Sequence, residues 1–215
     1  MNGPRTFCAV AGNIGSGKST LTSLLAERFA WRPYYEHVEG NPYLADFYQD
    51  MQRWAFHLQV YFLSKRFQHH QEILASPISV IQDRTIYEDA EIFARNLHEN
   101  GRIDARDHEN YRELFDTMVQ FLEPPDLLIY LRTSVPILIE RIRARGRDYE
   151  RAIPAEYLAQ LDRHYEDWIA RYDLSPVLVV ETDACNLVAE EAELAEVAER
   201  IQRRLEATRG YSLPL

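Results

Sequence analysis

Near the start of the chain, the segment Gly12–Ser19 reads GNIGSGKS and has glycine, lysine and serine at the spacing of a phosphate-binding loop. The glycines allow backbone N–H groups to turn inward around the β- and γ-phosphates of a nucleotide. Lys18 supplies a positive charge to the same oxygens, and the Ser19 hydroxyl can hold Mg²⁺. The apolar run Phe7–Ala11 precedes the loop and a helical pattern follows it, which is the context that the motif requires. The predicted nucleotide-binding residues are Gly12, Asn13, Ile14, Gly15, Ser16, Gly17, Lys18, Ser19 and Thr20.

Two further charged groups follow later apolar runs, at positions where parallel strands would end. Glu36 lies at the end of the second run, and Asp83-Arg84 follows the third. Open parallel sheets bind ligands at the carboxyl ends of their strands, and phosphoryl transfer to a hydroxyl profits from a carboxylate near the hydroxyl proton. Glu36 is the candidate for that role, and Asp83 is placed to hold Mg²⁺ directly or through water. Either carboxylate could instead cap the helix that follows it.

A third group of charges lies in the segment Arg141–Arg147, where arginines alternate with other residues around one glycine. Such arginines can converge on a transferring phosphoryl group and neutralise its charge. The segment therefore predicts a lid, over about residues 141–153, in which Arg141, Arg145 and Arg147 reach the phosphates. The alternative is an exposed basic helix end that complements the helix dipole.

The elements that must position these groups form an alternating pattern of short apolar runs and longer helical stretches. The runs are near-continuously apolar, as parallel strands buried on both faces should be, and they are Phe7–Ala11, Tyr34–Val38, Ile78–Gln82, Leu127–Leu131 and Val177–Val180. Helical patterns cover Thr20–Phe29, Tyr43–Leu74, Tyr87–Leu97, His108–Phe121, Val135–Arg145, Ala155–Tyr172 and Leu187–Glu206. Strands joined by helical crossovers predict a doubly wound α/β fold, with a five-stranded parallel sheet flanked by helices in one domain over residues 1–215.

The composition of the 215 residues restricts the setting in which this fold works. With 46% hydrophobic and 12% aromatic residues, the chain can form one domain with a sizeable core. The net charge of −10 opposes binding to nucleic acid, and no apolar stretch approaches the roughly 18 residues of a membrane-spanning helix. The 2 cysteines are too few for a disulfide framework or a metal-ligand cluster. We therefore expect a soluble protein in a reducing, cytoplasmic setting, with neither nucleic acid nor membrane as a partner.

Two large classes of nucleotide-binding protein lack support in this sequence. A GTPase needs a D-x-x-G and an Asn-Lys-x-Asp motif, but none of the 8 glycines has aspartate three positions before it, and no asparagine precedes a lysine. A transporter-type ATPase carries a glycine-rich signature far from the loop, whereas the glycines outside Gly12–Gly17 are isolated. The remaining class is a small P-loop kinase with a small-molecule acceptor and an arginine-rich lid.

Beyond these motifs, nearly the whole chain resembles the deoxyribonucleoside kinase family, in particular its bacterial deoxyadenosine/deoxycytidine kinase and deoxyguanosine kinase branch. Five stretches in the same order carry the resemblance. They are Gly12–Thr20, Tyr35–Val38 leading into Asn41–Leu44, Tyr48 through Arg53–Gln59, Gln82–Asp89, and Arg145–Arg147 followed by Glu150 and Ile153-Pro154.

The resemblance implies roles for individual residues around the reacting groups. It makes Glu36 the general base for a 5′-hydroxyl, and Arg84 the cation that holds this hydroxyl and the incoming phosphate. Lys18 joins them in catalysis from the phosphate-binding loop. Tyr48 and Glu150 resemble the pair that binds the sugar 3′-hydroxyl.

At the base end, Gln59 resembles the family glutamine that reads the base through its amide. Arg66 and Asp89 resemble the charged pair beyond it, and Phe93 is the ring expected on one face of the base. Leu58 stands where the mammalian members place an aromatic residue, which leaves the partner of the other face open.

Two other departures from the mammalian members are acceptable within the bacterial branch. His37 follows Glu36 where those enzymes have proline, and the sequence Asp83-Arg84-Thr85 replaces Glu-Arg-Ser. Neither change removes a group to which the resemblance gives a role.

Together these features predict an enzyme that uses ATP and Mg²⁺ to phosphorylate the 5′-hydroxyl of a deoxyribonucleoside in nucleotide salvage. Deoxyadenosine is the expected acceptor, with deoxyguanosine and deoxycytidine as alternatives. A different small-molecule kinase would need extra cations for an acceptor phosphate, and a nucleotide-sensing module would bind ATP without needing Glu36.

The resemblance further implies a homodimer built from the long helix Tyr43–Leu74 and its neighbour, because that stretch has more apolar surface than one small sheet would cover. It also implies inhibition by the end-product deoxynucleoside triphosphate. Such an inhibitor would place its base in the nucleoside pocket and its phosphates in Gly12–Ser19.

Overall fold

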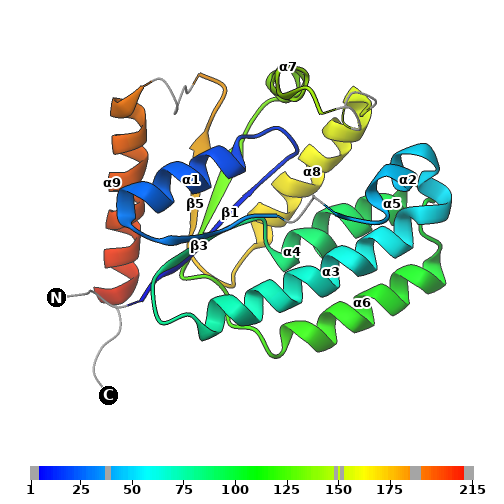
Figure 1. Ribbon diagram of the computed structural model, residues 1–215, viewed down its shortest axis with the longest axis horizontal. Coiled ribbons are helices and arrows are strands. Elements are labelled where there is room, and N and C mark those ends of the chain that lie inside the picture. The colour runs from blue at the N-terminus through cyan, green and yellow to red at the C-terminus, as the bar shows by residue number, and fades with distance from the viewer. Residues whose placement is uncertain (1–4, 37–39, 148–149, 151–152, 185–189, 211–215) are drawn as a thin grey trace.

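The chain folds around one sheet of five parallel strands in the order β2-β3-β1-β4-β5 (Figure 1). The strands are Phe7–Gly12 (β1), Arg32–Tyr34 (β2), Val80–Asp83 (β3), Leu127–Arg132 (β4) and Val177–Glu181 (β5). The computed structural model describes residues 5–36, 40–147, 150, 153–184 and 190–210, with only the backbone for 209 and 210. The doubly wound sheet predicted from the sequence is confirmed.

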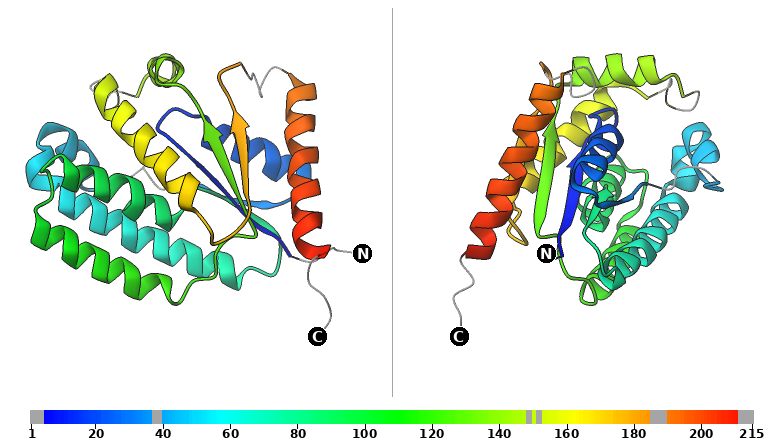
Figure 2. Two further views of the ribbon diagram at one scale, coloured as in Figure 1. Left: turned by 180° about the vertical axis from the view of Figure 1, so that it is seen from behind. Right: turned by 60° about the vertical axis from the view of Figure 1, so that its left-hand side comes forward.

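Helices connect these strands and cover both faces of the sheet (Figure 2). They are Lys18–Phe29 (α1), Leu44–Gln49 (α2), Met51–Ala75 (α3), Ile86–Glu88 (α4), Arg95–Glu99 (α5), Ala105–Val119 (α6), Val135–Arg145 (α7), Ala155–Arg171 (α8) and Glu191–Gly210 (α9). A π-helical segment, Asp89–Ala94 (η1), lies between α4 and α5. Within the described residues, no helix combines the length and apolarity needed to cross a membrane.

The central strand β1 is buried over its whole length and alternates between two cores. Ala9 and Ala11 face the core that α3, α6 and α8 cover, whereas Cys8 and Val10 face the core under α1 and α9. Successive strand residues point to opposite faces of a sheet, so an apolar run without polar interruption is what a strand covered on both sides requires.

Two predicted helices are more broken than the periodicity indicated. The predicted helix Tyr43–Leu74 is divided at Asp50, whose backbone is non-helical and whose side chain accepts a hydrogen bond from Arg53 N. Aspartate satisfies a free N–H at a helix start better than it stabilises a helix interior, so α3 begins anew there. The predicted helix Tyr87–Leu97 consists of α4, η1 and α5 in direct succession.

Other element bounds also differ from the prediction: α6 is Ala105–Val119 instead of His108–Phe121, and α9 ends at Gly210 instead of Glu206. β2 is Arg32–Tyr34 instead of Tyr34–Val38, because it lies at the sheet edge, where Pro33 needs no ladder hydrogen bond. Residues 37–39 lie outside the described residues, as do 185–189 at the predicted start of the last helix. β3 begins at Val80, and the apolar Ile78 before it is exposed.

The other edge strand, β5, is covered by side chains from α9. Arg200 donates to the carbonyl of Val179 at 2.7 Å, and Arg204 donates to that of Val177 at 3.2 Å. These arginines occupy carbonyl groups on the strand that ends the sheet.

The phosphate-binding loop packs directly against α7, the helix that leads into the predicted lid. A Cβ added at Gly15 would lie 2.9 Å from Cγ1 of Ile142 and 3.0 Å from the carbonyl oxygen of Leu138, and Gly15 has a φ of +85°. The loop therefore needs glycine here for its backbone conformation and for its close approach to α7.

We expect Gly15→Ala to lower the free energy of unfolding by about 2–4 kcal/mol, from about 1 kcal/mol of left-handed strain and about 1–3 kcal/mol of overpacking. Gly101→Ala is the matched control, because Gly101 has a φ of +67° but open space around its Cβ position. Urea unfolding measures the decrease in the free energy of unfolding for each variant. Equal destabilisation would show that α7 adds no steric restriction to the loop.

Candidate active site

One cavity of about 680 Å³ opens at the carboxyl ends of the strands and collects most of the predicted site residues. The predicted residues that line it are Ile14–Thr20, Glu36, Tyr48, Gln59, Asp83, Arg84, Asp89, Phe93, Arg141, Arg145, Arg147 and Glu150. Gly12, Asn13 and Arg66 are not among the lining residues; Gly12 and Asn13 lie at the start of the loop, and Arg66 pairs with Asp89.

The loop presents its positive groups to the cavity. α1 begins at Lys18. The residue before it is Gly17, which has a φ of 97° and no side chain that could cap the helix. The N–H groups of the first turn are therefore directed to a ligand site with the positive end of the helix dipole. The Nζ of Lys18 donates to the carbonyl of Asn13 at 2.9 Å. Burial lowers the pKa of Lys18 to about 8, and the charge of Arg84 contributes.

Asp83 and Ser19 meet beside the loop, as the magnesium prediction requires. The Ser19 hydroxyl donates to Oδ2 of Asp83, while the buried Oδ1 has no hydrogen-bond partner within the described structure. Burial raises the pKa of Asp83. An unpartnered carboxylate oxygen next to a hydroxyl suits a hard cation with oxygen ligands, so these two residues fit Mg²⁺. The described residues hold no cluster of three His, Cys, Asp or Glu side chains around a metal position, so phosphates and water would supply the other ligands.

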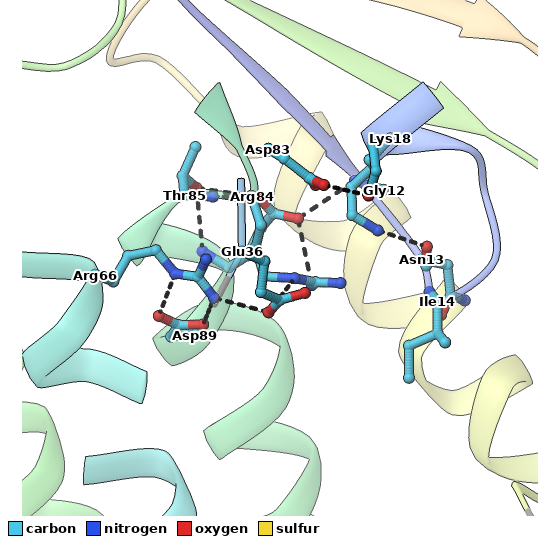
Figure 3. A network of polar contacts seen from close by, with 12 residues as sticks. Gly12, Asn13, Ile14, Lys18, Glu36, Arg66, Asp83, Arg84, Thr85 and Asp89 are labelled. Atoms are coloured by element: carbon cyan, nitrogen blue, oxygen red, sulfur yellow. Dashed lines mark hydrogen bonds and ion pairs between the residues drawn. The ribbon is translucent and has the colours of Figure 1, made fainter. Parts of the chain in front are cut away.

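Glu36 lies between two arginines at the centre of the polar network (Figure 3). Its Oε1 accepts a hydrogen bond from Nη2 of Arg66 at 2.9 Å and is 3.1 Å from Nε of Arg84 in an ion pair. Burial alone would raise the pKa of Glu36, but the charges of Arg84 and Arg66 outweigh it and lower the pKa to about 2. The carboxylate is therefore ionised at neutral pH.

Arg84 follows the last residue of β3 and has an unusual backbone conformation. Its φ is 69°, which is the left-handed region that a non-glycine residue enters only at a cost. The backbone N–H donates to the carbonyl of Val10 at 3.0 Å. The guanidinium lies 4.5 Å from the ring centre of Phe93, so Phe93, expected beside a base, also supports Arg84.

At the far end of the cavity, Arg66 and Asp89 form the predicted charged pair. Arg66 donates through Nε to Oδ2 at 3.0 Å and through Nη2 to Oδ1 at 3.2 Å (Figure 3). Gln59 is buried, and its Oε1 has no hydrogen-bond partner among the described residues. This end of the cavity thus offers acceptor oxygens to a ligand.

The predicted lid arginines differ in their contacts. Arg141 donates to the carbonyls of Ser16 at 3.2 Å and Thr182 at 2.6 Å, so it joins the phosphate-binding loop to the end of β5. Arg145 and Arg147 lie 2.7 and 3.3 Å from Glu150 in ion pairs.

Glu150 and Tyr48, expected at a sugar hydroxyl, both line the cavity. In this structure Glu150 accepts hydrogen bonds from Arg145 and Arg147. Residues 148, 149, 151 and 152 of the predicted lid lie outside the described residues.

Several residues at the site were not predicted. They line the cavity and are Tyr35, Leu44, Phe47, Phe62, Tyr157 and Thr182. Leu58, at the position where the mammalian members place an aromatic residue, also lines the cavity. Arg66 contacts Glu36 as well as Asp89, and no sequence signal joins these separate elements. Thr85 and Glu88 form a capping box, which the T-x-x-E spacing could have revealed.

The sequence and the fold both match known proteins. Residues 8–206 match the deoxynucleoside kinase family profile. The chain is 38% identical to the deoxyadenosine/deoxycytidine kinase of Bacillus subtilis over 91% of each chain. It is 37% identical to a deoxyguanosine kinase of Lactobacillus acidophilus, over 93% of this chain and 91% of that one. The solved deoxyadenosine kinase from M. mycoides with bound dATP superposes with a TM-score of 0.81 at 29% identity, over 92% of this chain and 100% of that one.

The family match over residues 8–206 covers the loop, the strand ends and the arginines of the predicted lid, all of which contribute residues to the cavity. By its sequence profile, by its relatives and by its fold, the chain belongs to the deoxynucleoside kinase family.

Proposed function

We propose that this protein transfers the γ-phosphoryl group of ATP to the 5′-hydroxyl of a deoxyribonucleoside, with deoxyadenosine as the preferred acceptor. The observation that carries this proposal is Glu36, an ionised carboxylate held between Arg84 and Arg66 in the same cavity as Lys18. One cavity can therefore hold a donor phosphate and an acceptor hydroxyl next to each other.

On the donor side, the chain's own groups bind and orient the triphosphate. Lys18 and the first-turn N–H groups of α1 hold the β- and γ-phosphates. Ser19 and Asp83 would hold Mg²⁺, which when bound neutralises charge on the phosphate oxygens. Arg141 already contacts the loop, and Arg145 and Arg147 supply further positive charge at the cavity.

On the acceptor side, Glu36 takes the proton of the 5′-hydroxyl. A pKa of about 2 makes Glu36 a weak base, but phosphoryl transfer passes through a loose transition state in which the attacking oxygen carries little early bonding. The proton leaves late, so the reaction needs an ionised acceptor in position more than a strong base. Arg84 lies 3.1 Å from Glu36. It would therefore lie beside the attacking 5′-oxygen and stabilise the charge of the incoming phosphoryl group.

The preference for adenine rests on the acceptor groups at the base end. Gln59 presents a carbonyl oxygen without a hydrogen-bond partner among the described residues. Burial raises the pKa of Asp89, but two hydrogen bonds from Arg66 favour its ionised form, which can only accept hydrogen bonds. Adenine and cytosine have an exocyclic amino group to donate, whereas the thymine oxygen would face acceptors. Relatives named as deoxyadenosine/deoxycytidine and deoxyguanosine kinases support a purine or cytosine acceptor, and deoxyguanosine and deoxycytidine are the second candidates.

The charge pattern disfavours the two other classes. A nucleoside monophosphate kinase needs free cations for the acceptor phosphate, yet Arg66 and Arg84 are both paired with carboxylates. A nucleotide-binding module would gain nothing from Glu36 beside the transferring phosphate.

A homodimer and end-product inhibition are also part of the proposal. The short helix α2 and the long helix α3 carry none of the exposed large hydrophobic side chains found among the described residues, and the neighbouring α6 carries one, Leu114. The proposed dimer therefore rests on the family resemblance more than on surplus apolar surface. A relative binds dATP, and one cavity here reaches from the loop to Asp89. A deoxynucleoside triphosphate could occupy both ends of it.

Glu36→Gln should lower kcat by about 10²–10⁴, because the loss of a positioned general base slows the chemical step. The KM for the nucleoside should change only a few-fold, since the side-chain shape is kept. Glu140→Gln, on the exposed face of α7, is the charge-matched control and should leave both constants unchanged. A raised KM with an unaltered kcat would assign Glu36 to binding alone.

The lowered pKa of Lys18 predicts a pH dependence. The cationic form is present below pH 8 and is lost as the pH rises through about 8, so kcat/KM for ATP should fall there. Bound phosphates favour the cation, so kcat should decline only at higher pH. Lys18→Arg does not titrate in this range, and its remaining activity should lack the fall. A constant kcat/KM for wild type from pH 7 to 9.5 would contradict the assignment.

The base assignment predicts that thymidine is disfavoured against deoxyadenosine by about 10²-fold or more in kcat/KM. Asp89→Asn should narrow this ratio, because the amide can direct its oxygen to Arg66 and its NH₂ to a thymine oxygen. Arg66 is left intact because it also contacts Glu36. Competition assays with both nucleosides measure the ratio. Equal use of thymidine by the unmodified enzyme would refute the role of Asp89.

A further inference from the structure

A buried carboxylate outside the cavity joins the phosphate-binding loop to the support of Arg84. Glu88 is 0% exposed. Its Oε1 accepts from the Gly12 N–H at 3.3 Å and from the Tyr165 hydroxyl at 2.8 Å, and Oε2 accepts from the Thr85 N–H at 2.7 Å. One carboxylate therefore contacts the first residue of the loop and the segment that follows β3.

Tyr165, on α8, completes the connection to Arg84. Its hydroxyl accepts from Nη1 of Arg84 at 3.0 Å and donates to Glu88 at 2.8 Å. Arginine can only donate, so the hydroxyl proton must be directed to the carboxylate. Burial raises the pKa of Tyr165, which keeps that proton in place. The oriented chain runs Arg84, Tyr165, Glu88, Gly12.

Arg84 needs such support more than most arginines. Its left-handed backbone conformation persists only where the surrounding contacts compensate for the strain. The guanidinium is held from one side by the Phe93 ring and from another by the Tyr165 hydroxyl. Arg84 also forms ion pairs with Glu36 at 3.1 Å and with Glu88 at 3.6 Å. The Tyr165 hydroxyl adds a directed hydrogen bond to these charge contacts.

The helix α8 also contacts the loop a second time. Nδ2 of Asn13 donates to the carbonyl of Leu158 at 2.9 Å. The same helix thus holds the donor loop through Asn13 and Arg84 through Tyr165, and Glu88 connects the two contacts. Neither Tyr165 nor Glu88 lines the cavity, so neither can touch a substrate there.

We propose that Tyr165 and Glu88 are positioning residues that hold the Arg84 guanidinium in a fixed place relative to the phosphate-binding loop. They set the distance between the cation and the loop to that of the transferring phosphoryl group. This inference rests on the proposed phosphoryl transfer, because it gives Arg84 a place at the reacting atoms.

The first test is Tyr165→Phe, which removes one oxygen and keeps the ring that stacks on Tyr130 at 5.8 Å. We expect kcat to fall about 10- to 100-fold, the size of a small misplacement of a reacting group, with the KM for ATP and nucleoside within about twofold. Tyr130→Phe is the matched control: that ring is equally buried, but its hydroxyl donates to Glu166 at 2.9 Å. It should lose similar thermal stability and keep kcat.

The second test asks whether Tyr165 acts through Arg84. In an Arg84→Ala background, measured by single turnover at high enzyme concentration, Tyr165→Phe should change the rate by less than about twofold, because the group it positions is gone. An unchanged effect in that background would overturn the inference. Glu88→Gln keeps the side-chain shape but also removes the charge that pairs with Arg84. It should lower kcat at least as much as Tyr165→Phe and should likewise lose its effect in the Arg84→Ala background, so it serves as the second variant if Tyr165→Phe unfolds.

The outcomes separate the two proposals. An unmodified protein that phosphorylates no nucleoside would remove both. An active wild type with full kcat in Tyr165→Phe and Glu88→Gln would remove only the positioning role and leave the proposed function in place.

Discussion

Buried charge is compensated at the acceptor end of the cavity, which is the end where Glu36, Arg66, Arg84 and Asp89 meet. This compensation is the constraint on which the rest of the site depends. Arg66 and Arg84 are each 4% exposed, and a buried guanidinium without a carboxylate partner would be strongly unfavourable. Glu36 contacts both arginines, Asp89 pairs with Arg66, and Glu88 lies 3.6 Å from Arg84. The carboxylates are therefore as necessary to the fold of this region as to its chemistry, and they leave the acceptor end suited to a neutral ligand.

The donor end has the opposite character. Lys18 donates to a backbone carbonyl, and Arg141 donates to carbonyl and hydroxyl oxygens. Among the described residues, no carboxylate is in direct contact with Lys18 or Arg141, whereas Arg145 and Arg147 pair with Glu150. The charges of Lys18 and Arg141 therefore favour a polyanion in this half of the cavity. The two ends of the cavity thus differ in electrostatic character, which is consistent with the proposed direction of phosphoryl transfer.

Local signals in the sequence were sufficient for the loop and the fold class, because glycine spacing and apolar runs act within one element, but they misplaced the edge strand β2, which is Arg32–Tyr34. They were insufficient where the deciding interaction joins elements. The Arg66 contact with Glu36 and the Tyr165 contact with Arg84 depend on how α3 and α8 pack, which no spacing encodes. The prediction of one helix over Tyr43–Leu74 failed for a different reason: Asp50 caps α3 and interrupts the helix, although the apolar periodicity continues through it.

The treatment of the sheet edges limits how copies of this chain can associate. β2 is three residues long with Pro33 in its middle, and α9 covers carbonyls of β5 with two arginines. Short, proline-containing or covered edges resist the addition of a strand from another molecule. Both edges of the described sheet are poor templates for intermolecular strand pairing, which protects the chain against edge-to-edge aggregation.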